Sequence, residues 1–373
     1  MKQTSNAVLI AGAPARYPDL RYATGFFSFD PVIFLKTNRR RYFAVSPLDF
    51  EHVKRTVKNT RVISMADLPV RKNSKSPLAD RIAALLNKNG VQAVTIPPYF
   101  PVGLANRLSD CGIQATVAEE NLFPEREIKT APEIESIAYA QKAAVKAMDT
   151  ALAMLAGAEI ARNRLLRIGN KPLTSETLSD SIDKTARDFE CICYATIAAG
   201  GPQGANPHEI GSGPLKADEP IVIDIFPQHI ESGYWGDLTR TFVRGTPSPR
   251  IQKTYAAVCD AQRAAIAKIK AGVKASDVHN AAARLFDKRG FPTGKRQGRA
   301  FGFIHGVGHG VGLEIHEAPR IAPVEGKLKA GMVITIEPGL YYPGRYGIRL
   351  EDLGVVTRTG CRLIEPKKYP FAI

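Results

Sequence analysis

The stretch IVIDIFPQHIESGYWGDLTRTF, residues 221–242, decides how this sequence is interpreted. It opens with an apolar strand pattern that carries one acid, Asp224, in its middle. A carboxylate buried among such neighbours is unfavourable unless a cation or hydrogen bonds compensate it. After a turn through residues 231–233, a second strand pattern begins beside Asp237. Acids on adjacent antiparallel strands can converge on one face, and two such charges favour a bound metal ion.

A second informative stretch is IHGVGHGVGLEIHE, residues 304–317, which holds three of the chain's seven histidines, His305, His309 and His316. Its many glycines argue against a helix and for a backbone that approaches a ligand closely. The spacing of His305 and His309 matches the helix of zinc peptidases, but that motif needs a glutamate where this sequence has Gly306. We therefore reject the zinc-helix interpretation.

Two more strand patterns near the C-terminus carry acids. Glu337 follows an apolar run and precedes a Pro-Gly turn, and the period-two pattern at 347–352 puts Arg349 and Glu351 on one face. Each acid alone has a simpler interpretation as a salt-bridged strand residue. Together the candidates provide four carboxylates and one imidazole, a set that suits a pair of divalent ions such as Mn²⁺ or Fe²⁺ better than one structural zinc ion: Asp224, Asp237, His309, Glu337 and Glu351.

The remaining sequence predicts an α+β protein of two domains, 1–124 and 125–373. The first alternates short β-branched or aromatic runs with segments of helical period, which indicates a small α/β domain. Thr130-Ala131-Pro132-Glu133 is typical of a helix start and opens the second domain. There we expect helices at about 132–156, 174–189, 249–270 and 276–289, strands at 221–225 and 238–243, and a glycine-rich, strand-like C-terminal third.

Composition limits the class of protein, its location and its partners. With 373 residues and 44% hydrophobic content the chain can bury a sizeable core, so a disordered or fibrous protein is excluded. Five scattered cysteines fit a reducing, cytoplasmic location, and no apolar run is long enough to span a membrane. The net charge of +15 is interpreted as a generally basic surface, with a functional anionic partner as the alternative; nucleic acid is not the partner we expect.

These residues resemble the metallopeptidases of the pita-bread fold, family M24, and within it the X-prolyl aminopeptidase and prolidase branch. The resemblance covers nearly the whole chain, and residues 20–26, LRYATGF, look like the start of that branch's creatinase-type N-terminal domain. It implies a dinuclear-metal aminopeptidase, or dipeptidase, that hydrolyses the N-terminal bond of peptides with proline in second position. The implied ions are two divalent cations, Mn²⁺ first, with Co²⁺, Fe²⁺ or Zn²⁺ as alternatives. The implied assembly is a homodimer.

The resemblance also implies a role for each site residue. Asp224, Asp237, His309, Glu337 and Glu351 would bind the metal ions, with Asp237 and Glu351 as bridges, and a water or hydroxide between the ions would attack the peptide carbonyl. Glu337 would also transfer protons. The remaining site residues would line the substrate pocket and orient the carbonyl or brace the acidic cluster: His208, His305, His316 and Arg349.

The sequence departs from the family pattern in one respect. The interval from Asp224 to Asp237 is two residues longer than expected, but an even insertion in a hairpin keeps both side chains on the same face.

The first alternative function is that of a catalytically silent binding or chaperone-like module of this fold. The second is a metal-independent hydrolase of C–N bonds, of creatinase type. Both conflict with five competent ligand positions, because a buried acidic set without a metal ion is unfavourable.

Overall fold

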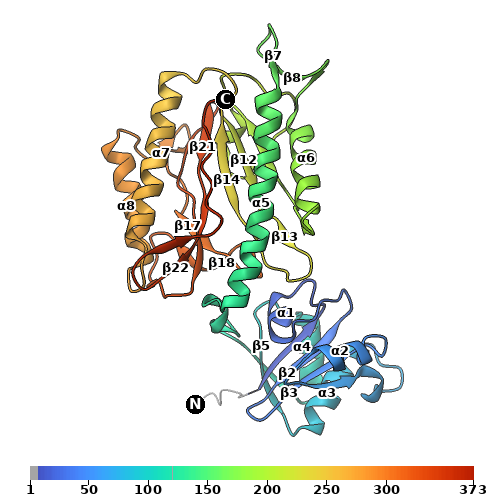
Figure 1. Ribbon diagram of the computed structural model, residues 1–373. Helices are drawn as coiled ribbons and strands as arrows, with labels where there is room; N and C mark the ends of the chain where they lie inside the picture. Colours follow the sequence, from blue (N-terminus) through green and yellow to red (C-terminus); the bar gives the residue numbers. More distant parts are fainter. Residues whose placement is uncertain (1–6, 120) are drawn as a thin grey trace. The chain divides into compact units, whose positions relative to one another are not determined.

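The structure is a computed structural model that describes residues 7–119 and 121–373. Contacts within the chain divide it into two compact units, Met1–Arg126 and Glu127–Ile373. The predicted domain boundary at residues 124 and 125 lies two residues before this division. The first unit is drawn from blue to blue-green and the second from green to red (Figure 1).

The first unit is built on a mixed six-stranded sheet with strand order β4-β3-β2-β1-β5-β6. Strands β1, β2 and β3 pair antiparallel, whereas β4, β5 and β6 each join a neighbour in parallel. The strands are β1 (Val8–Gly12), β2 (Val32–Lys36), β3 (Arg41–Val45), β4 (Arg61–Ser64), β5 (Ala93–Ile96) and β6 (Gln114–Val117). The β-branched and aromatic runs of the first domain at 32–35, 42–45 and 93–96 lie within β2, β3 and β5.

Helices cover both faces of this sheet, which explains why its central strands read as continuous apolar runs. Leu9 and Ile33 pack in one core with residues of α3 (Pro77–Lys88) and α4 (Val102–Asp110). Their chain neighbours Ile10 and Phe34 pack in a second core with residues of α1 (Pro18–Thr24) and α2 (Phe50–Thr56). The first unit is therefore an α/β domain with a hydrophobic core on each side of its sheet.

The second unit begins with α5 (Ala131–Gly157), whose start is fixed by a capping box. The backbone amide and the hydroxyl of Thr130 both donate to the Glu133 carboxylate. The other helices are α6 (Ser175–Arg187), α7 (Pro249–Lys268) and α8 (Ala275–Lys288). All four lie within two residues of the predicted ranges.

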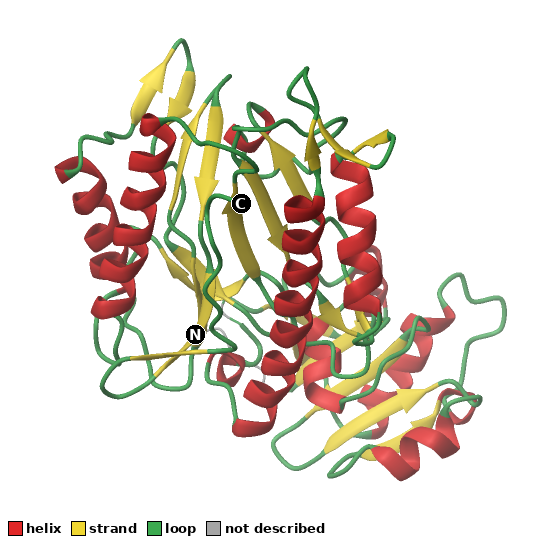
Figure 2. Ribbon diagram, turned by 45° about the horizontal axis from the view of Figure 1, so that its top comes forward, coloured by secondary structure: helices red, strands yellow, loops and turns green. Residues whose placement is uncertain are grey.

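Two helix pairs flank the strands of the second unit. Figures 1 and 2 show α5 and α6 on one side of these strands and α7 and α8 on the other. The first pair packs in one core with β12 (Ile221–Ile225) and β14 (Leu238–Phe242). The second pair packs in another core with β19 (Val333–Ile336), β20 (Gly339–Tyr342) and β21 (Tyr346–Arg349). The strands that carry the candidate acids thus lie between two layers of helices.

Two principal sheets hold these strands. One has the order β11-β12-β14, with β11 (Ile197–Gly200) at its edge, and the other has the order β18-β17-β19-β22-β23. The strands of the second sheet not yet given are β17 (Gly308–Gly310), β18 (Glu317–Ile321), β22 (Asp352–Val356) and β23 (Cys361–Leu363). Short pairings at the periphery use β7 (Glu159–Ile160), β8 (Leu166–Ile168), β9 (Lys171–Pro172), β10 (Cys191–Ile192), β13 (Gln228–His229), β15 (Gly294–Arg296) and β16 (Arg299–Phe301).

Two further observations concern the cysteines and the helices. All five cysteines are free thiols. Among the residues that the structure describes, no helix has the length and apolar character needed to cross a membrane.

Candidate metal centre

Three predicted ligands from three separate parts of the second unit meet in one place. A carboxylate oxygen of Asp237, a ring nitrogen of His309 and a carboxylate oxygen of Glu351 all lie within 4.8 Å of one another. Asp237 precedes β14, His309 lies in β17, and Glu351 stands between β21 and β22. Both principal sheets and the β20–β21 hairpin therefore contribute to the centre.

The hairpin of β12 and β14 places the two aspartates on one face. Asp224 pairs with Thr239, which lies two residues after Asp237. Because side chains alternate faces along a strand, Asp224 and Asp237 point to the same face of the sheet. The longer connection between them forms the short strand β13, whose Gln228 bridges to Trp235. The two extra residues in this connection therefore leave both aspartates on the same face of the sheet.

Asp237 is fixed by helix α5. The Gln141 side chain donates to the Asp237 carbonyl at 3.0 Å and accepts from the Asp237 amide at 2.7 Å. Both residues are buried. A Cβ atom at Gly236 would lie 2.6 Å from the α5 backbone at Ala140, so only glycine allows this approach. The Gly-Asp pair is therefore held directly against the helix.

Asp224 is held on one side only. The Arg349 Nη2 donates to Asp224 Oδ2 at 2.7 Å, whereas Asp224 Oδ1 is buried without a hydrogen-bond partner among the described residues. Arg349 is itself buried, and its Nη1 donates to the Tyr341 hydroxyl at 2.9 Å. One oxygen of Asp224 is thus oriented by the arginine, and the other is left for a further electropositive partner.

His309 and Glu337 are linked through Thr335 of β19. The Thr335 hydroxyl accepts from the His309 amide at 3.0 Å and donates to Glu337 Oε1 at 3.3 Å. The His309 Nε2 lies 3.3 Å from Glu337 Oε1 and 3.7 Å from Asp237 Oδ2, while its Nδ1 faces the Gly310 carbonyl. Nε2 is therefore the ring nitrogen presented to the carboxylates.

The glycines around His309 serve the sheet rather than a ligand. A Cβ atom at Gly308 would lie 2.0 Å from the Thr335 carbonyl oxygen, and one at Gly310 would lie 2.2 Å from that of Ala318. Both contacts are to neighbouring strands. The expectation of no helix here is confirmed, but the close approach is of strand to strand, not of backbone to ligand.

The carboxylates oppose one another electrostatically. Burial, and then the neighbouring carboxylates, raise the pKa of Asp237 and of Glu351 well above their usual values. Burial also raises the pKa of Glu337, but the hydrogen bond with His309 and the positive charges nearby outweigh it and lower that pKa to about 2. Asp224 contributes its charge to the shifts of both Asp237 and Glu351. A buried set of this kind requires cations to be fully ionised.

The predicted pocket histidines surround this acidic set. The His305 Nε2 lies 2.9 Å from the Tyr341 hydroxyl, and the His316 ring contacts the His309 ring edge-on with centroids 4.3 Å apart. Burial lowers the pKa of both, and the charge of His208 adds to this lowering. His208 is exposed, in a loop whose Pro207 carbonyl accepts from Arg349. The three histidines therefore lie near one another although the loop of His208 is distant in sequence.

Four residues of the centre were not predicted from the sequence: Gln141, Thr239, Thr335 and Tyr341. Two of them had a signal that could have found them, because Thr239 and Thr335 each lie two residues from an acid and so share its face of the strand. The Thr239 hydroxyl donates to Glu351 at 2.7 Å. Gln141, on a helix 96 residues before Asp237, had no such signal.

The donor set fits divalent cations. Its oxygen-rich composition with one imidazole suits Mn²⁺- or Fe²⁺-like ions, and the partnerless Asp224 Oδ1 is a buried oxygen that such an ion would satisfy. The ring orientation of His309 agrees, because a ligating histidine commonly has its other nitrogen hydrogen-bonded.

Comparison with known proteins identifies the family. The sequence profile of metallopeptidase family M24 matches residues 135–358, more than half of the chain. The chain belongs to metallopeptidase family M24. This M24 chain is 30% identical over 367 residues to the Xaa-Pro dipeptidase of Pyrococcus horikoshii, which covers 97% of the chain and 93% of the relative. It is 36% identical over 239 residues to the Xaa-Pro dipeptidase of Pyrococcus furiosus, and this match spans 64% of the chain and only 62% of that relative.

Solved structures agree with this assignment. The prolidase from Pyrococcus furiosus superposes with a TM-score of 0.79 at 25% identity, covering 98% of this chain and 97% of that one. The Xaa-Pro dipeptidase from Bacillus anthracis shares the fold with a TM-score of 0.84 at 23% identity, covering 99% and 95%. The predicted fold, a creatinase-type N-terminal domain followed by a pita-bread domain, is confirmed. So is the resemblance to the X-prolyl branch, and the M24 chain is a metallopeptidase whose family implies divalent metal ions.

Proposed function

We propose that this M24 metallopeptidase hydrolyses the N-terminal peptide bond of substrates with proline in second position, with X-Pro dipeptides as its principal substrates. The observation that carries the proposal is the convergence of Asp237, His309 and Glu351 within 4.8 Å beside two further acids. A buried acidic set of this composition has little physical reason to be kept unless cations occupy it.

Five residues would hold two divalent ions: Asp224, Asp237, His309, Glu337 and Glu351. Asp237 and Glu351 would bridge the ions. Burial and the neighbouring carboxylates raise the pKa of both residues. When bound, such a pair of ions lowers the pKa of a water molecule and polarises the scissile carbonyl.

The chain's own residues would supply the rest of the chemistry. Glu337, with its low pKa, is a carboxylate at neutral pH and would accept a proton from the attacking water and pass it to the leaving nitrogen. His305 and His316, kept neutral by burial, would orient the carbonyl with His208. Arg349 would hold the Asp224 carboxylate in place through the bond to its Oδ2.

Proline specificity is supported by the names of the relatives rather than by a pocket. The relatives from both Pyrococcus species are Xaa-Pro dipeptidases, and an N-terminal domain of the prolidase type is present. The relatives therefore favour dipeptides over longer peptides.

The test uses matched peptides, Ala-Pro, Ala-Ala and Ala-Pro-Ala, with chelator-stripped full-length protein. Release of the N-terminal residue is measured without metal and with Mn²⁺, Co²⁺, Fe²⁺ or Zn²⁺. We expect metal-dependent cleavage of Ala-Pro, little of Ala-Ala, and slower cleavage of the tripeptide. Glu351→Gln serves as the inactive reference.

Each contrary outcome points to a different error. Faster cleavage of the tripeptide would favour an aminopeptidase, and equal cleavage of Ala-Ala would contradict proline specificity. Two bound ions per chain without cleavage would indicate another substrate. Failure to bind metal would favour the silent binding module, and cleavage without metal the creatinase-type hydrolase.

A further inference from the structure

A second cluster of like charge lies in the same unit and shares no residue with the acidic set. A hollow of about 580 Å³ is lined by residues from three elements, the start of α7, the β15–β16 hairpin and the turn between β20 and β21. Its lining includes Arg250, Arg296, Arg299, Phe301, Tyr342 and Arg345. Nothing in the proposed peptidase reaction uses these side chains.

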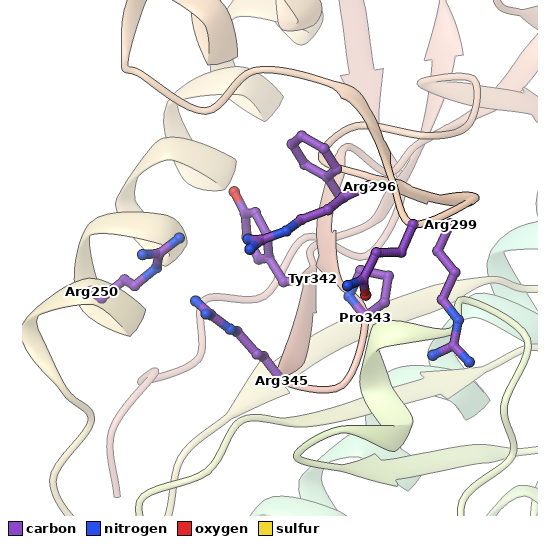
Figure 3. Close-up of a pocket in the computed structure, with 8 residues that line it drawn as sticks. Arg250, Arg296, Arg299, Tyr342, Pro343 and Arg345 are labelled. Atoms are coloured by element: carbon purple, nitrogen blue, oxygen red, sulfur yellow. The ribbon is translucent and has the colours of Figure 1, made fainter.

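Three of the arginines converge. Figure 3 shows the side chains of Arg250, Arg296 and Arg345 directed toward one space beside Tyr342, whereas Arg299 extends away from it. We call this space the arginine hollow and define it by Arg250, Arg296 and Arg345. Each comes from a different element, so the convergence depends on the fold and not on a run of basic residues.

No counter-charge accompanies the three guanidinium groups. Across residues 7–119 and 121–373, no ion pair within 4.0 Å joins any of them to an Asp or Glu carboxylate. Other arginines of this unit do form such pairs, for example Arg240 with Asp352 at 2.7 Å. Mutual repulsion in the hollow is therefore relieved only by solvent and dissolved anions.

Arg250 adds to this imbalance by its place in α7. It stands in the first turn of the helix, directly after Pro249, and that turn has no acidic residue. The positive end of the helix dipole lies there and disfavours a cation. A bound anion would be stabilised both by the helix end and by the three arginines.

Aromatic rings complete the hollow. Phe301 and Tyr342 line it, and the Arg250 guanidinium lies 5.7 Å from the centre of the Tyr342 ring. A second hollow of about 500 Å³ shares these two rings and Arg250 and adds Lys253. Together they offer flat apolar surface beside concentrated positive charge, a combination that suits a ligand with both an aromatic group and phosphates.

We propose that the arginine hollow binds a nucleotide bearing two or more phosphates, independently of the peptidase reaction. The phosphates lie among Arg250, Arg296 and Arg345, and the base lies against Phe301 and Tyr342. The volume is in the range of small-molecule sites, about 300–1,000 Å³. Convergence of the three arginines on one space favours a compact ligand over a nucleic acid strand, which needs an extended basic groove.

The test is calorimetric titration of the full-length, metal-loaded protein with ADP, pyrophosphate, adenosine, a twelve-nucleotide single-stranded DNA and a Glu-rich peptide. We expect saturable binding of ADP that weakens as salt is added, weaker binding of pyrophosphate and still weaker binding of adenosine. The pair Arg296→Ala with Arg345→Ala should weaken ADP binding at least about tenfold, because it removes two charge-assisted contacts. Peptidase activity should not change.

A charge-matched control separates the hollow from the general surface. Lys327→Ala with Arg358→Ala removes two exposed positive charges of the same unit that do not line the hollow, and it should leave ADP binding unchanged. Equal loss in both double variants would show nonspecific attraction to a chain of net charge +15 and overturn the proposal.

Titrations with the other ligands decide which class of ligand the arginine hollow binds. No saturable binding of ADP up to about 1 mM would overturn the proposal. Equal affinities for ADP and pyrophosphate would remove the role of the rings and with it the nucleotide assignment. Preference for the DNA strand or for the acidic peptide over ADP would replace the nucleotide by that class of partner.

Discussion

Two clusters of like charge in the second unit differ in their burial and in their bonding partners. The acids of the metal centre are buried or nearly so, and each is oriented by named partners: Gln141 for Asp237, Thr239 for Glu351, Thr335 for Glu337 and Arg349 for Asp224. The arginines of the hollow are exposed and have no carboxylate partner among the described residues. Buried charge must be organised by the fold, whereas exposed charge can rely on solvent.

The largest expected effect comes from removing one buried acid. Glu351→Gln should lower kcat/KM for Ala-Pro at least about a thousandfold, equal to about 4 kcal/mol of transition-state stabilisation, because the proposed metal site loses one of its carboxylate ligands. In metal-free protein the same change should raise the melting temperature, since it removes a carboxylate whose pKa burial and neighbouring acids raise. Steady-state kinetics and calorimetric melting measure the two effects.

The sign of the stability effect follows from that raised pKa. The folded metal-free protein favours the protonated form of Glu351, so the contribution of this residue to stability is fully present below the ordinary pKa near 4.5 and is lost as the pH rises toward the folded value. Glu351→Gln should flatten this loss. A metal-free variant less stable than the parent at neutral pH would contradict the buried repulsion.

A smaller effect should come from the helix that positions Asp237. Gln141→Leu leaves the Asp237 amide and carbonyl buried without their partner, which should cost about 1–3 kcal/mol of unfolding free energy. Urea denaturation of metal-free protein measures it. Glu135→Ala, an exposed change on the same helix, is the matched control and should change the free energy of unfolding by less than about 0.5 kcal/mol. Equal effects of the two substitutions would show that the hydrogen bonds between Gln141 and Asp237 do not stabilise the fold.

A half-buried histidine offers a third test. His279 of α8 stacks on Phe303, and within the described part of the chain its Nδ1 is buried without a hydrogen-bond partner. Burial, with the charge of His305, lowers the pKa of His279 below 6.5. The folded state thus favours neutral histidine, and its stability should fall as the pH falls from 6.5 toward the folded value. His279→Phe should reduce this dependence in melting curves from pH 7.5 to 5. An unchanged dependence would mean that His279 protonates without penalty.

The smallest effect is expected in the arginine hollow. Arg345→Ala should leave the free energy of unfolding within about 0.5 kcal/mol of the parent, or raise it slightly, because the residue is exposed and repels its neighbours. Melting at low and high salt measures this, and any gain should shrink as salt screens the repulsion. A clear loss of stability would show that Arg345 is a structural residue and would weaken the contrast with the buried acids.

Sequence patterns predicted most of the scaffold and of the acidic set. The helix over α5 followed from its capping signal at Thr130 and Glu133, and the strand around Asp224 from its unbroken apolar run. The alternation of Arg349 and Glu351 gave their common face. These features are local, because hydrogen-bonding partners and side-chain period are set by nearest neighbours along the chain.

Contacts between distant elements were not available from the same patterns. The Gln141 clamp joins residues 96 positions apart, and the bond between Thr239 and Glu351 joins residues 112 apart. The arginine hollow likewise exists only because a helix start, a hairpin and a turn meet. The sequence by itself determined which side chains make up the acidic set and which strands present them. Only the tertiary structure decided their partners and the position of the hollow, because those depend on how the two sheets and four helices pack.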